Sequence, residues 1–458
     1  MSDSAWREIG YGPWSAEQAV PHQELDEDTR RALDLPPTLR PVHGEAVVQR
    51  PVFDPSARHY SKAMRLGNPE FADAETGERW FAARRRALDL VLAAVADSPW
   101  SEHLVLRGSV LLRAWYGQAA REPGDLDFVV EPDTWQLADE RTERMLDGLA
   151  HGADLRSRDS RCDVRLDSRR AVRDEIWTYD RVPGRRLVIP WTAEGVPGGT
   201  VQLDFVFTEP LPQPAARTAI PRPGGAEGDA PLSVRAATPE LSLAWKILWL
   251  MDDIHPEAKD LYDAVLLAED EAVSLPFDLL RAVFRGVDDG YYDRSPLFLD
   301  WLGHHVDSST EWSEFTKEYP HLTVSESDWG QRLTHALAPT FALDDTFALD
   351  DGSLGESVRY LEFVRWLAPL IEESRTAFTE GGLPGLLERL LTSYVPPQSA
   401  LVVTRELLGR AEYGVADVLP LLVAFRRRGM EHSWQRDRWE EEWLNQAAEK
   451  LSGAGGQG

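Results

Sequence analysis

The chain has 458 residues, with 43% hydrophobic residues, 28% charged residues and a formal net charge of −28. This composition is typical of a soluble globular protein, and the length predicts two or three domains of about 150 residues each. The single cysteine, Cys162, excludes an internal disulfide bond and a zinc site built from several thiolates. We find no apolar stretch that could span a membrane and no apolar leader, so we expect a cytoplasmic protein without a membrane partner.

The first elements lead from an irregular segment into a helix and a strand. Residues 1–75 contain several prolines and little hydrophobic periodicity, which predicts an N-terminal extension to which we assign no function. From Glu78 to Val95 the apolar residues recur at helical spacing, and the helix is expected to end at Asp97-Ser98-Pro99. Residues 104–106 then predict a short strand that runs into Gly108.

A Gly-Ser pair followed by two aspartates has the layout of a metal and nucleotide site. Gly108 lets the backbone approach a ligand closely, and Ser109 offers a hydroxyl at a helix start, where free N–H groups attract anions. Asp125 and Asp127 stand two apart on an apolar strand, so both carboxylates project from one face. Two hard oxygen ligands suit Mg²⁺ carrying phosphates. Each half alone fits an ordinary turn or a solvated strand face, but the two in this order favour the site.

A third carboxylate lies on another predicted strand. Residues 186–190 and 201–207 both have strand character, and the second contains Asp204 among apolar neighbours. Asp204 either belongs with the other two carboxylates or holds a nearby loop in place. Residues 209–231 contain six prolines and predict an irregular connection.

The remainder of the chain is predicted to be helical. Thr238-Pro239-Glu240 has the chemistry of a helix start, and the helix contains Lys246, one of only five lysines. Lys246 is either a functional residue, which we favour, or an exposed helix lysine. Asp260 and Asp263 lie on the next helical segment, where a structural role, such as anchoring Lys246, and a direct role both stay open. From residue 276 the pattern remains helical to residue 451.

One stretch is basic although the chain is strongly acidic. Residues 151–190 contain ten arginines and seven acidic residues. The region from Arg156 to Arg173, which includes Arg158, Arg161 and Arg165, is either a phosphate-binding strip or a surface whose arginines pair with neighbouring acids.

These motifs resemble those of the AbiEii/AbiGii-type, MenT-like nucleotidyltransferase toxins, which belong to the polymerase-beta-like superfamily. Two signatures carry the resemblance over about residues 79–272: Arg107-Gly108-Ser109 with Asp125-Leu126-Asp127-Phe128, and the Thr238–Lys246 helix with Lys259-Asp260-Leu261-Tyr262-Asp263. The chain departs from the pattern in two places. The interval between Ser109 and Asp125 is longer than in some members, and Lys259 stands where arginine is usual.

The resemblance implies an α+β fold, with a small mixed sheet of polymerase-beta-like type followed by a large all-helical region. The expected domains are the extension (1–75), a nucleotidyltransferase sheet domain (76–235), a helical segment that completes the active site (236–275) and a C-terminal helical domain (276–458).

The resemblance also implies an activity. We expect a Mg²⁺- or Mn²⁺-dependent nucleotidyltransferase that moves NMP from an NTP to a macromolecular acceptor such as the 3′ end of tRNA, as the toxin of a toxin–antitoxin or phage-defence system, with an antitoxin as partner. The residues carried over are the metal ligands Asp125 and Asp127, with Asp204 as our candidate for the third, the phosphate-binding Gly108, Ser109 and Lys246, and Asp263 as a further catalytic residue. The acceptor is expected at Arg156–Arg173.

Two other readings stay open. A catalytically silent relative would use the same fold to hold a nucleotide or a partner, and a glycosyltransferase would use its Asp-x-Asp pair to bind a metal and a diphosphate.

Overall fold

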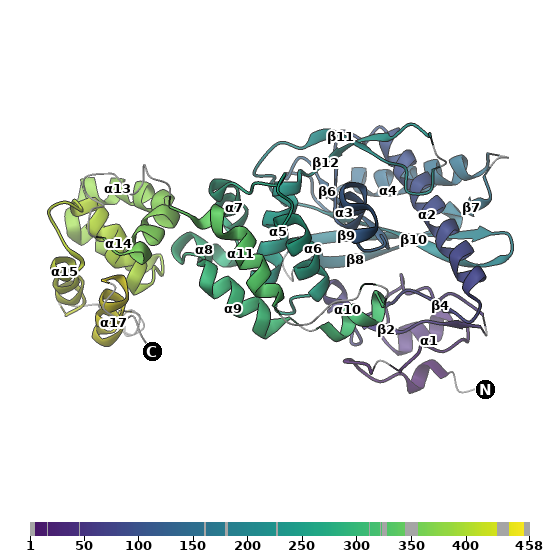
Figure 1. Ribbon diagram of the computed structural model, residues 1–458, viewed down its shortest axis with the longest axis horizontal. Helices are drawn as coiled ribbons and strands as arrows, with labels where there is room; N and C mark the ends of the chain where they lie inside the picture. Colours follow the sequence, from purple (N-terminus) through teal and green to yellow (C-terminus); the bar gives the residue numbers. More distant parts are fainter. Residues whose placement is uncertain are drawn as a thin grey trace. The chain divides into compact units, whose positions relative to one another are not determined.

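The structure is a computed structural model that describes residues 5–15, 17–44, 46–159, 162–178, 182–225, 228–310, 312–320, 322, 328–343, 356–427 and 439–452 (Figure 1). The chain forms two compact units, Met1–Ser274 with Val306–Trp329, and Leu275–His305 with Gly330–Gly458. The expected C-terminal domain comprised residues 276–458. Residues 306–329, which we expected in that domain, belong to the first unit.

A mixed sheet forms the centre of the first unit. Within the described residues it has eight strands in the order β11-β12-β5-β6-β10-β9-β7, with β8 paired to β9. The pairs β12·β5 and β6·β10 are parallel, and the other pairs are antiparallel. The strands are β5 (Leu104–Arg107), β6 (Asp125–Val130), β7 (Val164–Leu166), β8 (Val172–Thr178), β9 (Val182–Ala193), β10 (Val196–Val206), β11 (Ala216–Ile220) and β12 (Leu232–Ala236).

The sheet includes a strand that the sequence did not predict. Residues 209–231 were expected to form an irregular connection, but β11 lies within them and pairs with β12. The prolines flank this strand rather than interrupt it, so its backbone N–H groups remain available for the ladder.

Helices pack on this sheet and bring the predicted motifs together. α2 (Ala74–Ala96) begins where Asp73 accepts a hydrogen bond from the N–H of Thr76, and it packs against β10, β12 and α4. Thr238 caps α5 in the same way by accepting from the N–H of Leu241, as predicted. The other helices of this unit are η1 (Ala5–Glu8), α1 (Glu27–Ala32), η2 (Pro55–Ala57), α3 (Ser109–Tyr116), η3 (Gly117–Ala119), α4 (Glu140–Ser157), η4 (Ser168–Arg170), α5 (Pro239–Asp252), α6 (Ala258–Ala268) and α10 (Trp312–Glu318).

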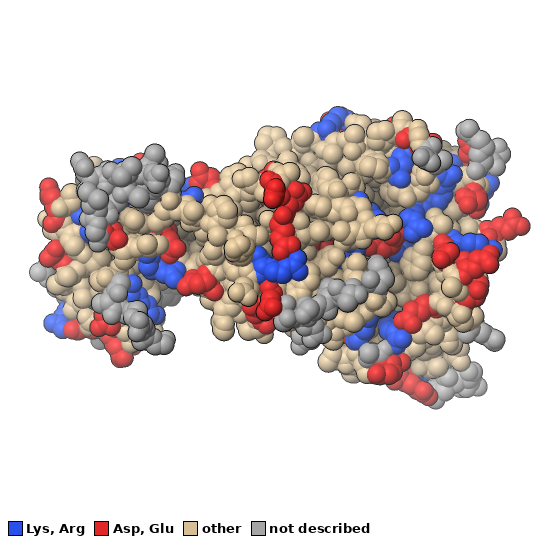
Figure 2. All heavy atoms as spheres, viewed as in Figure 1, with Lys and Arg blue, Asp and Glu red and all other residues tan. Residues whose placement is uncertain are grey.

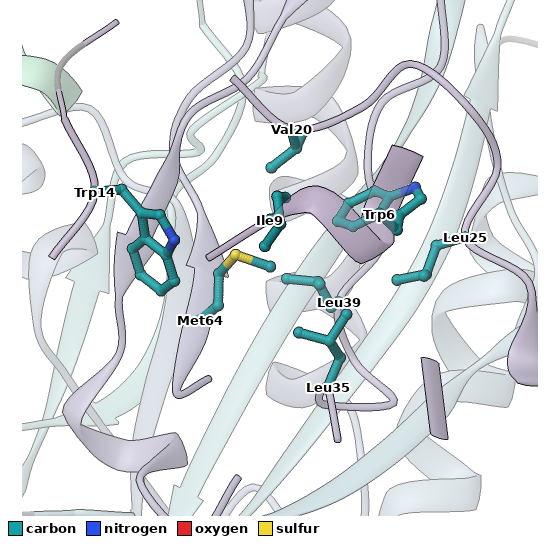
Figure 3. Close-up of a cluster of buried hydrophobic side chains, with 8 residues drawn as sticks. All are labelled: Trp6, Ile9, Trp14, Val20, Leu25, Leu35, Leu39 and Met64. Atoms are coloured by element: carbon teal, nitrogen blue, oxygen red, sulfur yellow. The ribbon is translucent and has the colours of Figure 1, made fainter. Parts of the chain in front are cut away.

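The N-terminal segment is folded and has its own apolar cluster. Eight buried side chains, several of them pointing toward one another in Figure 3, form this cluster: Trp6, Ile9, Trp14, Val20, Leu25, Leu35, Leu39 and Met64. Two small antiparallel pairs complete the segment, β1 (Val47–Val48) with β4 (Glu70–Phe71) and β2 (Pro51–Phe53) with β3 (Met64–Leu66). Burial of two tryptophans among aliphatic side chains fixes this segment despite its weak periodicity.

The second unit is helical in its described residues, as predicted. Trp366 lies in its core and donates a hydrogen bond to the carbonyl of Tyr292 at 2.6 Å. Gly382 interrupts the longest helix with a φ of 60°. The helices are α7 (Phe277–Phe284), η5 (Asp288–Gly290), α8 (Tyr291–Arg294), α11 (Trp329–Phe341), α13 (Val358–Thr392), α14 (Pro397–Leu408), α15 (Val415–Arg427) and α17 (Glu441–Leu451), and α9 (Leu299–Ser309) crosses the boundary between the units.

These observations confirm the α+β class with a mixed sheet followed by a helical region. None of the helices in the described part of the chain is long and apolar enough to cross a bilayer. Basic and acidic side chains lie next to one another on the face shown in Figure 2, in keeping with the many ion pairs of this arginine-rich chain.

Candidate metal and nucleotide site

Three aspartates meet where β6 and β10 run side by side. In the parallel register Asp204 lies opposite Asp127, and Asp125 precedes Asp127 by two residues on the same face of β6. One carboxylate oxygen from each of the three lies within 4.8 Å of the others. Leu126 and Phe128 alternate with the two β6 aspartates and are fully buried, so packing holds the strand that presents them.

The clustering of negative charge is visible in the pKa values. Burial, followed by the charges of Asp125 and Asp204, raises the pKa of Asp127 to about 8. Burial also raises the pKa of Asp204, although Arg186 acts in the opposite direction. A divalent cation among these oxygens would relieve both effects, and carboxylates are ligands that Mg²⁺ and Mn²⁺ accept.

Gly108 lies against this cluster in a conformation that favours glycine. Its φ is 83° and its ψ is −155°. A Cβ atom at this position would lie 2.3 Å from Oδ2 of Asp127, closer than any real contact. The glycine is therefore required both by the backbone angle and by the close approach to Asp127.

Ser109 opens α3 directly after this glycine. Its side chain is 4% exposed, and its Oγ has no hydrogen-bond partner in the described part of the structure. A buried hydroxyl without a partner is unusual and is commonly explained by a ligand or water. The first N–H groups of α3 lie at the same place, as predicted from the sequence.

A cavity of about 290 Å³ connects these groups. Its lining comes from the sheet, from α2, α5, α6 and α10, and from the N-terminal segment through residues that include Asp54 and Ser56. Of the residues predicted from the sequence, it contacts Gly108, Ser109, Asp125, Asp127, Asp204 and Lys246.

Lys246 is buried and anchored by two aspartates. Its Nζ lies 2.6 Å from Oδ1 of Asp260 and 2.9 Å from Oδ2 of Asp263. Burial alone would lower the pKa of Lys246, but these carboxylates outweigh it and the pKa lies above its ordinary value. The interpretation of Lys246 as an exposed helix lysine is therefore wrong.

Asp263 lies behind Lys246 and does not line the cavity. Both of its oxygens also accept from Arg121, at 2.9 and 2.7 Å. Arg121 and Lys246 outweigh the effect of burial and lower the pKa of Asp263. This position fits the anchoring role that the sequence left open.

Arg186 is a site residue that the sequence analysis missed. It lies on β9 and donates to both oxygens of Asp204, at 3.0 and 2.9 Å, and to Oδ2 of Asp54 at 2.6 Å. Ser56 accepts from the same guanidinium at 3.1 Å. Arg186 stands in an arginine-rich stretch and Asp54 is more than a hundred residues away, so no local pattern distinguishes either residue.

Several arginines of the predicted acceptor region pair with acidic residues of the protein itself. Arg156 pairs with Asp97, Arg158 with Asp154, and Arg173 with both Glu143 and Asp147. Arg165 donates to the backbone carbonyls of Ser157 and Cys162. Arg161 lies outside the described residues. Three arginines of the region are therefore paired with carboxylates, as the self-paired interpretation expects, whereas Arg165, Arg169 and Arg170 have no carboxylate within ion-pair distance among the described residues.

Comparison with protein families matches residues 90–347 to a family described as the nucleotidyl transferase AbiEii toxin of type IV toxin–antitoxin systems. No curated protein sequence matches the chain. A solved structure similar to this one is MenT4, a nucleotidyltransferase toxin from Mycobacterium tuberculosis H37Rv. It has 17% sequence identity and a TM-score of 0.40, and the match covers 59% of this chain and 87% of that one.

Proposed function

Because the chain belongs to the AbiEii family of nucleotidyltransferase toxins, we propose that it transfers a nucleoside monophosphate from a nucleoside triphosphate to a macromolecular acceptor. The observation that carries this proposal is the meeting of Asp125, Asp127 and Asp204 on the wall of one cavity with Gly108 and Ser109.

The donor set fits a divalent metal ion. Asp125, Asp127 and Asp204 supply hard oxygen atoms at mutual distances compatible with shared coordination, and burial together with the neighbouring charges of Asp125 and Asp204 raises the pKa of Asp127. Mg²⁺ or Mn²⁺ held there would stabilise the charge that develops on the transferring phosphate. Asp125 and Asp127 would hold the metal ion, with Asp204 as the third ligand.

The remaining predicted residues bind and orient the triphosphate. The backbone of Gly108 and the Ser109 hydroxyl, with the free N–H groups of α3, donate hydrogen bonds to phosphate oxygens. Lys246 brings a positive charge to the cavity, and Asp260 and Asp263 hold its ammonium group in position. Positioning and charge of this kind account for most of the catalysis in phosphoryl and nucleotidyl transfer.

Asp204 is suited to receive the proton of the acceptor hydroxyl. It lies opposite Asp127 in the sheet register, and Arg186 fixes both of its oxygens. Oδ1 of Asp204 retains a second lone pair for the metal ion or the acceptor, whereas Oδ2 also accepts a hydrogen bond from the side-chain amide of Gln202 at 3.1 Å. The acceptor class that we propose is the 3′ end of tRNA, and the toxin–antitoxin assignment of the family supports an antitoxin as partner.

Two alternatives lose support. The chain matches a family of nucleotidyltransferases, so a glycosyltransferase activity is less well supported. A catalytically silent relative would not need all three carboxylates and an anchored Lys246, and this chain has them all.

The test is transfer of label from each of the four α-³²P-labelled NTPs to total tRNA, with and without Mg²⁺. We expect one or more NTPs to label the RNA only when the metal is present, and Asp127→Asn to abolish labelling. If the label is found on protein instead of RNA, the chain is still a nucleotidyltransferase, but its acceptor is a protein. If the metal-loaded protein labels neither RNA nor protein with any NTP, the proposed function is wrong.

A further inference from the structure

One arginine on the cavity wall has donors without acceptors. Arg84, on α2, is 6% exposed and lines the cavity. Its Nη1 donates to Oδ1 of Asn68 at 2.7 Å, but its Nε and Nη2 have no hydrogen-bond partner among the described residues. The guanidinium lies over the rings of Trp80 and Phe81, at 5.4 and 4.9 Å from the ring centres.

Arg84 differs from most of the other cationic residues that line the cavity, because it has no carboxylate partner. Six of them form ion pairs with carboxylates: Arg65, Arg107, Arg121, Arg186, Lys246 and Lys259. In the described part of the chain, Arg84 and Arg40 line the cavity without a carboxylate partner. Of these two, only Arg84 is buried and has two unsatisfied nitrogen atoms.

A buried cation without a counterion is costly unless a ligand supplies one. Burial lowers the pKa of Arg84, and the carboxylates of Glu122 and Asp125 only partly oppose this. Two free donors on one planar guanidinium match two oxygens of a phosphate group. The ligand that would satisfy Arg84 is therefore a phosphate or a similar anion.

We propose that Arg84 binds a distal phosphate of the nucleoside triphosphate. This inference rests on the proposed function, because it assumes that the triphosphate enters the cavity of the three aspartates. Arg84 forms no ion pair with Asp125, Asp127 or Asp204. Because Arg84 does not contact these three carboxylates, we assign to it the β- or γ-phosphate of the bound nucleotide and not the reacting phosphate.

Ser109 provides a second unsatisfied donor on the same cavity. Its buried Oγ lacks a partner among the described residues, as do Nε and Nη2 of Arg84. The two residues come from different elements, α3 and α2, and both line the cavity. A triphosphate carries three groups of acceptor oxygens, so different phosphates of one ligand can pair with Ser109 and with Arg84.

The experiment measures binding by calorimetry in Mg²⁺ for the four NTPs, their NMPs and inorganic tripolyphosphate. We expect Arg84→Gln to weaken binding of the triphosphates and of tripolyphosphate by about tenfold or more, because two charge-assisted hydrogen bonds are lost. Binding of the NMPs should remain within about twofold of the parent. The control is Arg86→Gln, two positions along α2, since Arg86 donates to the carbonyl of Gly224 and does not line the cavity.

Thermal unfolding separates this role from a structural one. Arg84→Gln removes an uncompensated buried charge, so the ligand-free variant should unfold at or above the parental temperature. If the variant unfolds early, Arg84→Lys, which keeps the charge but loses the paired donors, should fold and still show weaker triphosphate binding. Parental affinity for tripolyphosphate in the folded variants, or an equal loss for NMPs, would overturn the inference while leaving the proposed function intact. A parent protein that binds none of the NTPs would instead overturn the proposed function, and the inference with it.

Discussion

Asp54, in the N-terminal segment, and Asp204, on β10, are joined through the single guanidinium of Arg186. The N-terminal segment, to which the sequence analysis assigned no function, is thus connected through Arg186 to a proposed catalytic carboxylate. Asp54 is 4% exposed and Arg186 is 6% exposed, so solvent does not weaken this connection strongly.

Asp54→Asn should slow turnover more than it weakens nucleotide binding. The substitution removes one of the two charges that hold Arg186, and a loosened Arg186 no longer fixes the orientation of Asp204. We expect kcat to fall by about tenfold, because small misplacements of a catalytic group are costly, with the Kd for NTP within about twofold of the parent. The measurement is steady-state transfer well below the melting temperature.

The matched control for Asp54 is Asp34→Asn. Asp34 also lies in the N-terminal segment and accepts hydrogen bonds from Ser61, but it does not line the cavity. A parental kcat for Asp54→Asn, or an equal loss for Asp34→Asn, would show that Arg186 does not transmit an effect to Asp204.

Gly108→Ala should inactivate the enzyme through Asp127. An alanine Cβ would lie 2.3 Å from Oδ2 of Asp127 and would adopt a backbone conformation that costs about 1–3 kcal/mol for residues other than glycine. Asp127 must then move, so we expect a loss of kcat of about a hundredfold.

Gly117→Ala isolates the backbone effect from the collision. Gly117, at the other end of α3, also has a positive φ, of 55°, but a Cβ there would meet nothing within 4 Å. This variant should lose some stability and keep its turnover. If both variants lose activity alike, the contact of Gly108 with Asp127 is not the cause.

The parts of the site that the sequence predicted are those with a local pattern. Gly108 and Ser109 stand together at a strand-to-helix turn, and Asp125 and Asp127 stand two apart on one strand, so short spacing was sufficient. Asp204 was recognised because a charge among apolar strand residues is unusual.

The parts that the sequence did not predict depend on long-range contacts. Arg84 and Arg186 lie in arginine-rich stretches, where nothing local separates a site residue from a surface one. Asp54 meets Arg186 across 132 residues. The apolar cluster around Trp6 and Trp14 was missed because its members come from irregular chain without a period of 2 or 3.6 residues.

Lys246→Ala should reduce both turnover and stability. Removal of the ammonium group takes a positive charge from the cavity, and we expect kcat to fall by about a hundredfold. It also removes a positive charge that pairs with the buried carboxylates of Asp260 and Asp263, so the melting temperature should fall. Lys246→Arg should recover more of the stability than of the rate, because a planar guanidinium cannot take the place of a compact ammonium group.

The control for Lys246 is Lys317→Ala. Lys317 also lies in the first unit, with its side chain 8% exposed, and pairs with Glu314, but it does not line the cavity. We expect this variant to lose stability and keep its kcat. Retention of the parental kcat by Lys246→Ala would remove Lys246 from the proposed site.

Asp263→Asn should destabilise the protein in a manner that depends on pH. Asp263 is fully buried between Arg121 and Lys246, which lower its pKa from the ordinary value of 3.8 despite burial. A carboxylate whose pKa is lower in the folded state stabilises the fold above its unfolded pKa, and this stabilisation is lost as the pH falls toward the folded pKa. At pH 7 the substitution should cost about 3–5 kcal/mol, because it removes one partner from a buried ion-pair network.

Urea unfolding of both proteins at pH 7, 5 and 3.5 measures this difference. We expect the difference between Asp263→Asn and the parent to be constant between pH 7 and 5 and to shrink at pH 3.5, where the unfolded parent binds a proton at this position. Asp97→Asn, which removes a 70% exposed partner of Arg156, should produce a much smaller difference at pH 7 because solvent screens that pair. A parental stability for Asp263→Asn at pH 7, accompanied by a loss of kcat, would contradict the anchoring role and return Asp263 to a direct part in the chemistry.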